Sequence, residues 1–252
     1  MDIKQTKKRI AVISGGTGYV GFEVAKKLSN DGMIIAMLYY NTTKDEVSNK
    51  LSVLEGKGHR AYSCNLADED AIKKTVDMIE EEMGDIYACI HTAGVMPKPK
   101  QLYLSTSKDL REQFDVNVFG SFNFLSACAL KLKDHKKGII IGITTAGVVT
   151  RTNTKARGAY SSIKFALQGM LVALKEELSP YNIRVYSVAP GFMEGGMNSS
   201  MPKAFVEIVK NSSPTKMITN ASEVAEKISF LCSDNSVNIK ELTFLIAPET
   251  QI

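Results

Sequence analysis

Short apolar runs alternate with longer amphipathic stretches along almost the whole chain. The runs carry few charges and many β-branched residues, as in Arg9–Ser14 (RIAVIS) and Gly138–Thr144 (GIIIGIT). Near-continuous apolar strands separated by helices are typical of a parallel sheet that is covered on both faces. Right-handed crossovers between such strands give a doubly wound sheet. We therefore expect an α/β fold with about seven parallel strands and helices on both faces.

The same pattern places the individual elements. Strands are predicted at Arg9–Ser14, Met33–Tyr40, Arg60–Ser63, Ile86–His91, Gly138–Thr144, Ile183–Val188 and Thr243–Ile246. Helices are predicted at Val20–Asn30, Lys44–Leu54, Asp68–Glu82, Lys108–Lys133, Gly158–Leu178, Pro202–Lys210 and Ala221–Cys232. No linker, repeat or low-complexity tract divides the 252 residues, which suits one domain, 1–252. The irregular segment around 192–216 holds two Asn-Ser-Ser triplets and two prolines, which is typical of a lid.

Composition excludes several classes of function. The net charge of +4 is too small to indicate a nucleic-acid partner. No apolar run approaches the roughly 18 residues of a membrane span, and the first residues lack a signal peptide's apolar stretch. The four cysteines form no C-x-x-C pair, so we expect buried free thiols, no metal site and a reducing, cytoplasmic location.

A glycine-rich turn follows the first predicted strand. The segment 14–21 reads SGGTGYVG and leads straight into a helix, with Gly15, Gly18 and Gly21 spaced three apart. Such a turn lets main-chain amides approach a pyrophosphate at the amino end of the helix. The alternative is an ordinary turn whose small residues pack the helix on the strand. The position between first strand and first helix favours dinucleotide binding.

The end of the second predicted strand bears on which dinucleotide is bound. The segment 38–44 reads LYYNTTK, with no acid before Asp45, whereas NAD binders usually place a carboxylate here for the ribose 2′-hydroxyl. Asn41, Thr42, Thr43 and Lys44 offer hydrogen-bond donors to a 2′-phosphate. Asn-Thr-Thr is also an ordinary turn and helix cap. On balance this segment favours NADP(H) over NAD(H).

Tyr160 and Lys164 lie four residues apart and so share one face of a predicted helix. A lysine beside a tyrosine favours the phenolate, and we expect it to lower the pKa of Tyr160. That makes a proton donor for a carbonyl or a base for an alcohol. The alternative is a helix tyrosine with its hydroxyl in solvent, and Tyr40 with Lys44 repeats the spacing elsewhere. The hydroxyls of 144–145, at the end of the fifth strand, favour the pair at Tyr160.

The order of these signals resembles the short-chain dehydrogenase/reductase family over essentially the whole chain. Further matches are His91-Thr92-Ala93-Gly94 where the family has Asn-Asn-Ala-Gly, Cys64-Asn65-Leu66, Asn117 on a helix, and Pro190-Gly191 after the sixth strand. Among subgroups the single-domain 3-oxoacyl-carrier-protein reductases are most similar, notably along the segment 188–194 (VAPGFME).

The resemblance implies a Rossmann-type fold and an enzyme that reduces a carbonyl with NAD(P)H. Tyr160 is then the general acid, Asn117 holds a water in a proton relay, and Thr145 takes the serine position, for which Thr144 is the alternative. It assigns catalysis to Asn117, Thr145, Tyr160 and Lys164, and cofactor binding to Gly15, Thr17, Gly18, Tyr19, Val20, Gly21, Tyr40, Asn41, Thr42, Thr43, Asn65, Leu66, Thr92, Ala93, Gly94, Tyr160, Lys164, Pro190 and Gly191. The expected partner is a small carbonyl substrate such as a 3-oxoacyl thioester or similar ketone. Family members usually pair through the long helices, which implies a homodimer or homotetramer.

The sequence also departs from the family pattern. Tyr19 stands at a glycine site of the core branch, Gly195 stands where a threonine is frequent, and the end of the chain lacks Asp-Gly-Gly. These departures, with His91 and Thr145, leave a catalytically weakened dinucleotide sensor or scaffold as an alternative. The glycine spacing leaves an isomerase or epimerase with tightly held NAD as a third. Met193, Met197 and Met201 either line an apolar substrate pocket or pack the lid.

Overall fold

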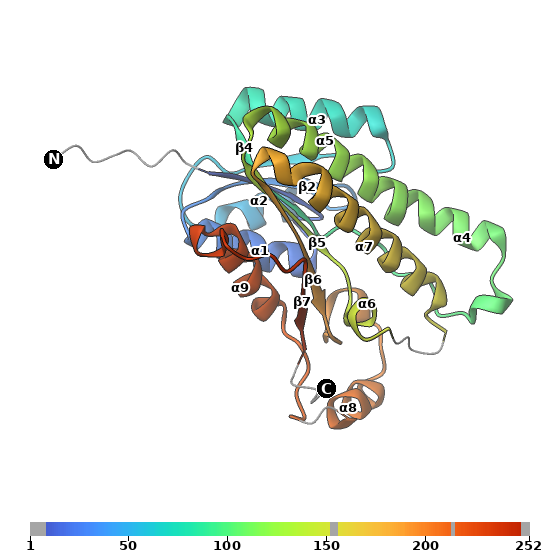
Figure 1. The fold of residues 1–252 in the computed structure, drawn as a ribbon. Coiled ribbons are helices and arrows are strands. Elements are labelled where there is room, and N and C mark those ends of the chain that lie inside the picture. Colours follow the sequence, from blue (N-terminus) through green and yellow to red (C-terminus); the bar gives the residue numbers. More distant parts are fainter. Residues whose placement is uncertain (1–8, 152–155, 213–214, 248–252) are drawn as a thin grey trace.

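A seven-stranded parallel sheet forms the centre of the molecule (Figure 1). The structure is a computed structural model that describes residues 9–151, 156–212 and 215–247. The strands follow the order β3-β2-β1-β4-β5-β6-β7, and every pairing is parallel. Their bounds are β1 Ile10–Ser14, β2 Ile34–Tyr39, β3 Arg60–Ser63, β4 Ile86–His91, β5 Gly138–Ile143, β6 Ile183–Pro190 and β7 Thr243–Ile246. The expected doubly wound sheet with helices on both faces is confirmed.

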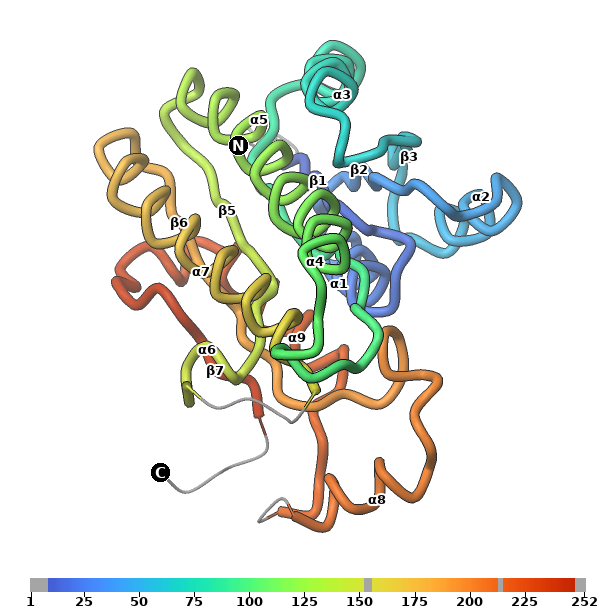
Figure 2. Tube along the Cα trace, turned by 90° about the vertical axis from the view of Figure 1, so that its right-hand side faces the viewer, coloured from blue at the N-terminus to red at the C-terminus, as the bar shows by residue number. Residues whose placement is uncertain are grey.

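Helices cover both faces of this sheet. The α-helices are α1 Tyr19–Asn30, α2 Lys44–Ser52, α3 Glu69–Met83, α4 Ser107–Phe114, α5 Gly120–His135, α6 Ala146–Thr150, α7 Gly158–Leu178, α8 Lys203–Ser212 and α9 Ala221–Cys232. Short 3-10 turns lie at Leu102–Leu104, Ser179–Tyr181, Gly196–Asn198 and Asp234–Ser236. Helices α3, α5 and α7 pack on one face, and α1, α2 and α9 on the other, as Figures 1 and 2 show.

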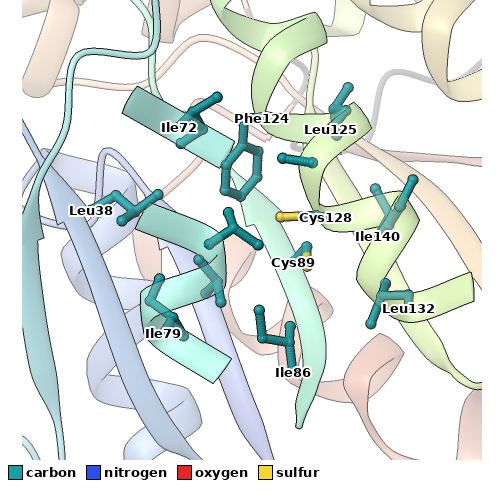
Figure 3. Packing of buried hydrophobic residues seen from close by; sticks show 14 of the residues in the cluster. Leu38, Ile72, Ile79, Ile86, Cys89, Phe124, Leu125, Cys128, Leu132 and Ile140 are labelled. Carbon is teal, nitrogen blue, oxygen red and sulfur yellow. The ribbon is translucent and has the colours of Figure 1, made fainter. Parts of the chain in front are cut away.

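The first of the two cores lies between the sheet and α3, α5 and α7 (Figure 3). Phe124 of α5 is fully buried there, and Ile72 of α3 and Ile140 of β5 belong to the same cluster. The thiols of Cys89 and Cys128 are buried in it, and burial raises the pKa of Cys89 far above its ordinary value. Burying each large apolar side chain stabilises the fold by roughly 1.5–3 kcal/mol. The four cysteines are buried and unpaired, as expected.

Two local features differ from the predicted elements. The helix expected over Lys108–Lys133 is interrupted, because a π-helical turn at Asp115–Phe119 separates α4 from α5. Helix α6 was not foreseen, since its five residues are too few to show helical spacing. No helix of the described residues is long and apolar enough to cross a membrane.

Candidate active site

The carboxyl ends of the parallel strands open into a cavity of about 1000 Å³. Its walls come from the loop after β1, the ends of β2, β4, β5 and β6, the amino end of α7 and the segment after β6. Of all the residues predicted for the site, only Asn117 and Thr43 do not line this cavity. The structure therefore brings together residues from distant segments of the chain at the edge where ligands bind in sheets of this kind.

The loop between β1 and α1 is fixed by main-chain bonds. Gly15 has a φ of +66°, a conformation that favours glycine, and its Cβ would lie 2.8 Å from the Cα of Ala93. The amide of Gly16 donates to the carbonyl of Leu38 at 3.0 Å, and Gly18 donates to Gly15 at 2.9 Å. Gly18 is the N-cap of α1, and within the described residues no side chain caps that helix end. The main-chain amides at the start of α1 therefore border the cavity, as a pyrophosphate requires.

The ends of β2 and β3 form the part of the cavity expected to hold the adenosine. The hydroxyls of Thr17 and Thr42 lie 2.8 Å apart, which joins the glycine loop to the end of β2. The Thr43 side chain instead caps α2, accepting from the Glu46 amide at 3.3 Å. Thr43 therefore caps α2, whereas its neighbour Thr42 lines the cavity.

Tyr160 and Lys164 lie one turn apart on α7, with the Lys164 Nζ 5.9 Å from the centre of the Tyr160 ring. Burial of the phenol raises the pKa of Tyr160, against the opposing effects of a hydrogen bond with Thr145 and the charge of Arg157. Burial lowers the pKa of Lys164 to about 8, and its Nζ donates to the carbonyl of Ile143 at 2.7 Å. The expected lowering of the Tyr160 pKa by the lysine is thus wrong for this structure, because the ammonium turns to the main chain.

The two threonines after β5 have different environments. Thr144 is buried, and its hydroxyl lies 2.8 Å from that of Ser187 on β6. Thr145 hydrogen-bonds to Tyr160, so its hydroxyl is the one beside the phenol. Of the two candidates for the serine position, this geometry favours Thr145.

Asn117 lies on the π-helical turn and is buried outside the cavity lining. Its Oδ1 accepts from the amide of Val95 at 2.8 Å, and its Nδ2 donates to the carbonyl of Gln113 at 3.1 Å. The amide side chain therefore holds the loop after β4, which carries cavity residues, against the helix.

His91 stands at the position of the first asparagine of the family motif, and both of its ring nitrogens have hydrogen-bond partners. Its Nδ1 lies 2.8 Å from the Ser14 hydroxyl and its Nε2 lies 2.7 Å from the Ser121 hydroxyl. Ser121 donates its only proton to the carbonyl of Asn117, so His91 must donate from Nε2 and accept from Ser14 at Nδ1. Burial lowers the pKa of His91 to about 3, consistent with this neutral ring.

The segment after β6 closes the remaining side of the cavity. Met193, Met197 and Met201 all line it, so of the two alternatives left open by the sequence the structure favours an apolar, adaptable cavity wall. Gly195 and Gly196 pack directly on Tyr19, since a Cβ on Gly196 would lie 2.8 Å from the Cβ of that tyrosine. Of the expected lid 192–216, positions 213–214 lie outside the described residues.

Comparison with known proteins identifies the family. Residues 18–244 match the family model described as Enoyl-(Acyl carrier protein) reductase. The chain is 30% identical over 250 residues to the 2,3-dihydro-2,3-dihydroxybenzoate dehydrogenase of Bacillus subtilis, covering 95% of this chain and 94% of that protein. The chain belongs to the short-chain dehydrogenase/reductase family.

Other relatives also cover nine tenths or more of the chain. The 3-oxoacyl-(acyl-carrier-protein) reductase FabG of Aquifex aeolicus is 28% identical over 239 residues, covering 93% of both chains. The 3alpha-hydroxysteroid dehydrogenase of Mediterraneibacter gnavus is 27% identical over 231 residues, covering 90% of this chain and 91% of that protein. A solved structure of an NAD+-bound xylitol dehydrogenase shares the fold, with a TM-score of 0.87 at 24% identity over 98% of this chain and 100% of that one.

As a short-chain dehydrogenase/reductase, the protein is an oxidoreductase that acts on an alcohol or a ketone with NAD or NADP. The cavity fits a dinucleotide, because uncapped helix amides and a close-packed glycine turn border it. Within the described residues there is no cluster of metal-binding side chains.

Sequence reasoning missed several residues of the cavity wall. Val95, Met96 and Phe192 line it, but isolated apolar residues in loops carry no periodic signal. Arg157 lines it too, and its position three residues before Tyr160 was a signal that helical spacing offers.

Proposed function

We propose that the protein reduces a ketone to an alcohol with NADPH or NADH, using Tyr160 as the general acid. The observation that supports this is one cavity that is lined both by the amino end of α1 and by Tyr160. When bound, the reduced dinucleotide supplies the hydride. Everything else is done by side chains of this chain, which position the carbonyl and deliver a proton.

Tyr160 donates its phenolic proton to the carbonyl oxygen as negative charge develops there. The raised pKa of the phenol keeps it protonated before the reaction, as a donor must be. Thr145, which hydrogen-bonds to Tyr160, donates its hydroxyl to the same oxygen. Two donors aimed at one oxygen stabilise its developing charge and fix its orientation.

Lys164 restores the proton and binds the dinucleotide's ribose in this proposal. Its pKa of about 8 lies near physiological pH, which suits a group that gives and regains a proton. Asn117 acts through position, because its side chain fixes the loop at Val95.

For the cofactor we favour NADP(H). The cavity wall formed by Tyr40, Asn41 and Thr42 includes no carboxylate. No aspartate or glutamate occurs anywhere among the described residues that line the cavity. A carboxylate would repel a 2′-phosphate, so its absence permits one. Binding of NADPH at least tenfold tighter than NADH supports this choice, and the reverse order contradicts it.

For the substrate we favour a 3-oxoacyl thioester or a similar ketone, held against the methionines of the segment after β6. Exposed apolar side chains on α5 and α7, such as Phe122, Leu130 and Val172, support a homodimer or homotetramer assembled through these helices. We expect the enzyme in the cytoplasm.

The deciding experiment is oxidation of NADPH and NADH with a panel of ketones that includes acetoacetyl thioesters. Turnover that falls by about 100-fold or more in Tyr160→Phe supports the proposal. Undiminished turnover in that variant contradicts it. Tight dinucleotide binding without any turnover favours instead a sensor or scaffold, the alternative that the altered motifs suggest.

A further inference from the structure

Arg157 immediately precedes α7 and lines the cavity one helical turn before Tyr160. Its main chain is fixed on both sides. The amide of Lys100 donates to the carbonyl of Ala156 at 3.0 Å, and the amide of Ser161 donates to the carbonyl of Arg157 at 2.9 Å. The backbone that carries this guanidinium is therefore held in place.

The side chain of Arg157, in contrast, has an unsatisfied hydrogen-bond donor. Its Nη1 is buried and has no hydrogen-bond partner among the described residues. A guanidinium stays charged at any physiological pH, and a buried donor without a partner is costly. Its charge acts at the reacting group, since it opposes the rise in the Tyr160 pKa. Arg157 as a whole is half-buried, but a cationic side chain with a buried, unsatisfied donor in a cavity wall indicates a ligand that supplies the missing acceptor.

The charges around the cavity point the same way. Among the described lining residues the cations are Arg157 and Lys164, and there is no aspartate or glutamate. Lys164 already donates to the carbonyl of Ile143. The amino end of α7, a helix of 21 residues with no side-chain cap among the described residues, adds positive potential beside Arg157.

We propose that the substrate carries a carboxylate beside the carbonyl that is reduced, and that Arg157 binds this carboxylate. This inference rests on the proposed function and narrows its substrate class to oxo acids, whose free carboxylate a 3-oxoacyl thioester lacks. A guanidinium forms two parallel hydrogen bonds with a carboxylate, which fixes direction as well as position. With the carboxylate on Arg157, the neighbouring carbonyl is oriented toward Tyr160, one turn further along α7.

The test compares acids with their uncharged esters. Pyruvate, acetoacetate and levulinate place the carboxylate at increasing distances from the ketone, and each has a methyl ester of nearly the same shape. Calorimetry measures binding of all six to protein saturated with the oxidised dinucleotide, where no reduction occurs. Turnover is then measured with the reduced dinucleotide. The variants are Arg157→Gln and, as a control with the same charge change, Arg151→Gln, whose exposed side chain lies outside the cavity lining.

We expect at least one acid to bind roughly 30-fold or more tightly than its ester. Arg157→Gln should abolish this preference while leaving dinucleotide binding unchanged, and Arg151→Gln should keep it. Esters that bind as well as acids, or a preference that survives in Arg157→Gln, overturn the inference. So does an Arg157→Gln variant that loses dinucleotide affinity as much as acid affinity.

The two proposals fail in different ways. Esters and acids reduced equally well, with loss of turnover in Tyr160→Phe, leave the reductase standing and remove the role of Arg157. If acids bind through Arg157 but are never reduced, the anion site is supported and the proposed reductase activity is contradicted.

Discussion

Gly15→Ala tests whether the turn after β1 is as tightly constrained as the structure indicates. The φ of +66° costs a non-glycine residue roughly 1–2 kcal/mol. The new Cβ would also lie 2.8 Å from the Cα and 2.9 Å from the nitrogen of Ala93. These are main-chain atoms that cannot rotate away, and overpacking of this kind costs about 1–3 kcal/mol more. We therefore expect a loss of roughly 2–5 kcal/mol in the free energy of unfolding.

Two other glycines separate the contributions. Gly32 has a φ of +84° with nothing within 4 Å of its Cβ position, so Gly32→Ala should lose only the conformational part, about 1–2 kcal/mol. Gly169 lies inside α7 with nothing within 4 Å, so Gly169→Ala should gain about 0.5–1 kcal/mol. Urea unfolding, carried out at one protein concentration, ranks the three variants by their free energy of unfolding. Calorimetry measures their affinity for NADPH.

We expect Gly15→Ala also to weaken NADPH binding, because Ala93 and the residues of the glycine loop line the same cavity. Gly32→Ala should bind NADPH as wild type does, since residue 32 lies outside the lining. If Gly15→Ala is no less stable than Gly32→Ala, the close approach to Ala93 relaxes freely and the argument from sterics is refuted.

Three further predictions concern single side chains. The pKa of His91 is about 3 in the folded protein and about 6.5 in the unfolded chain. Between these two pH values the unfolded chain binds more protons than the folded protein. The free energy of unfolding should therefore decrease as the pH falls below 6.5, by up to about 1.4 kcal/mol per pH unit. His91→Asn should flatten that slope, measured as urea midpoints at pH 7 and 5, and an unchanged slope contradicts the assignment. Thr145→Ala should lower kcat/KM roughly 100-fold with little effect on stability. Thr144→Ala should instead lose about 0.5–1.5 kcal/mol in urea unfolding, because it removes one buried hydrogen bond to Ser187, whose hydroxyl keeps its bond to Gln168. The opposite pattern would exchange the roles of the two threonines. Phe124→Ala should cost about 3–5 kcal/mol in thermal unfolding, and a loss below 1 kcal/mol would mean that the core in Figure 3 collapses around the gap.

The fold was predictable because buried parallel strands leave a strong trace in sequence. Runs such as IAVIS and GIIIGI are almost entirely apolar and cannot be confused with a surface helix, and β1 and β5 lie within one residue of their predicted bounds. Most of the predicted site residues line the cavity for the same reason, since they follow strand ends that meet at one edge of the sheet. Helix α6 and the π-helical turn were not, because both are shorter than the window over which helical spacing becomes visible.

What sequence could not supply is the direction in which each polar group points. The spacing of Tyr160 and Lys164 placed them on one face of a helix, but not the Lys164 ammonium on the carbonyl of Ile143. Likewise, Thr42 and Thr43 were both predicted to bind the dinucleotide. In the structure the Thr43 side chain instead forms a capping box with Glu46 at the start of α2. The electrostatics of the site therefore required the structure.

The departures from the family pattern, which suggested lost activity, have partners in the fold. The neutral ring of His91 is satisfied at both nitrogens by Ser14 and Ser121. Gly195 and Gly196 leave the space that the ring of Tyr19 occupies, so unusual residues far apart in sequence compensate each other. Thr145 keeps a hydroxyl bonded to the phenol of Tyr160. A site that had lost its function would have no reason to keep such matched changes, so they support a reductase with an altered pocket over a sensor or scaffold.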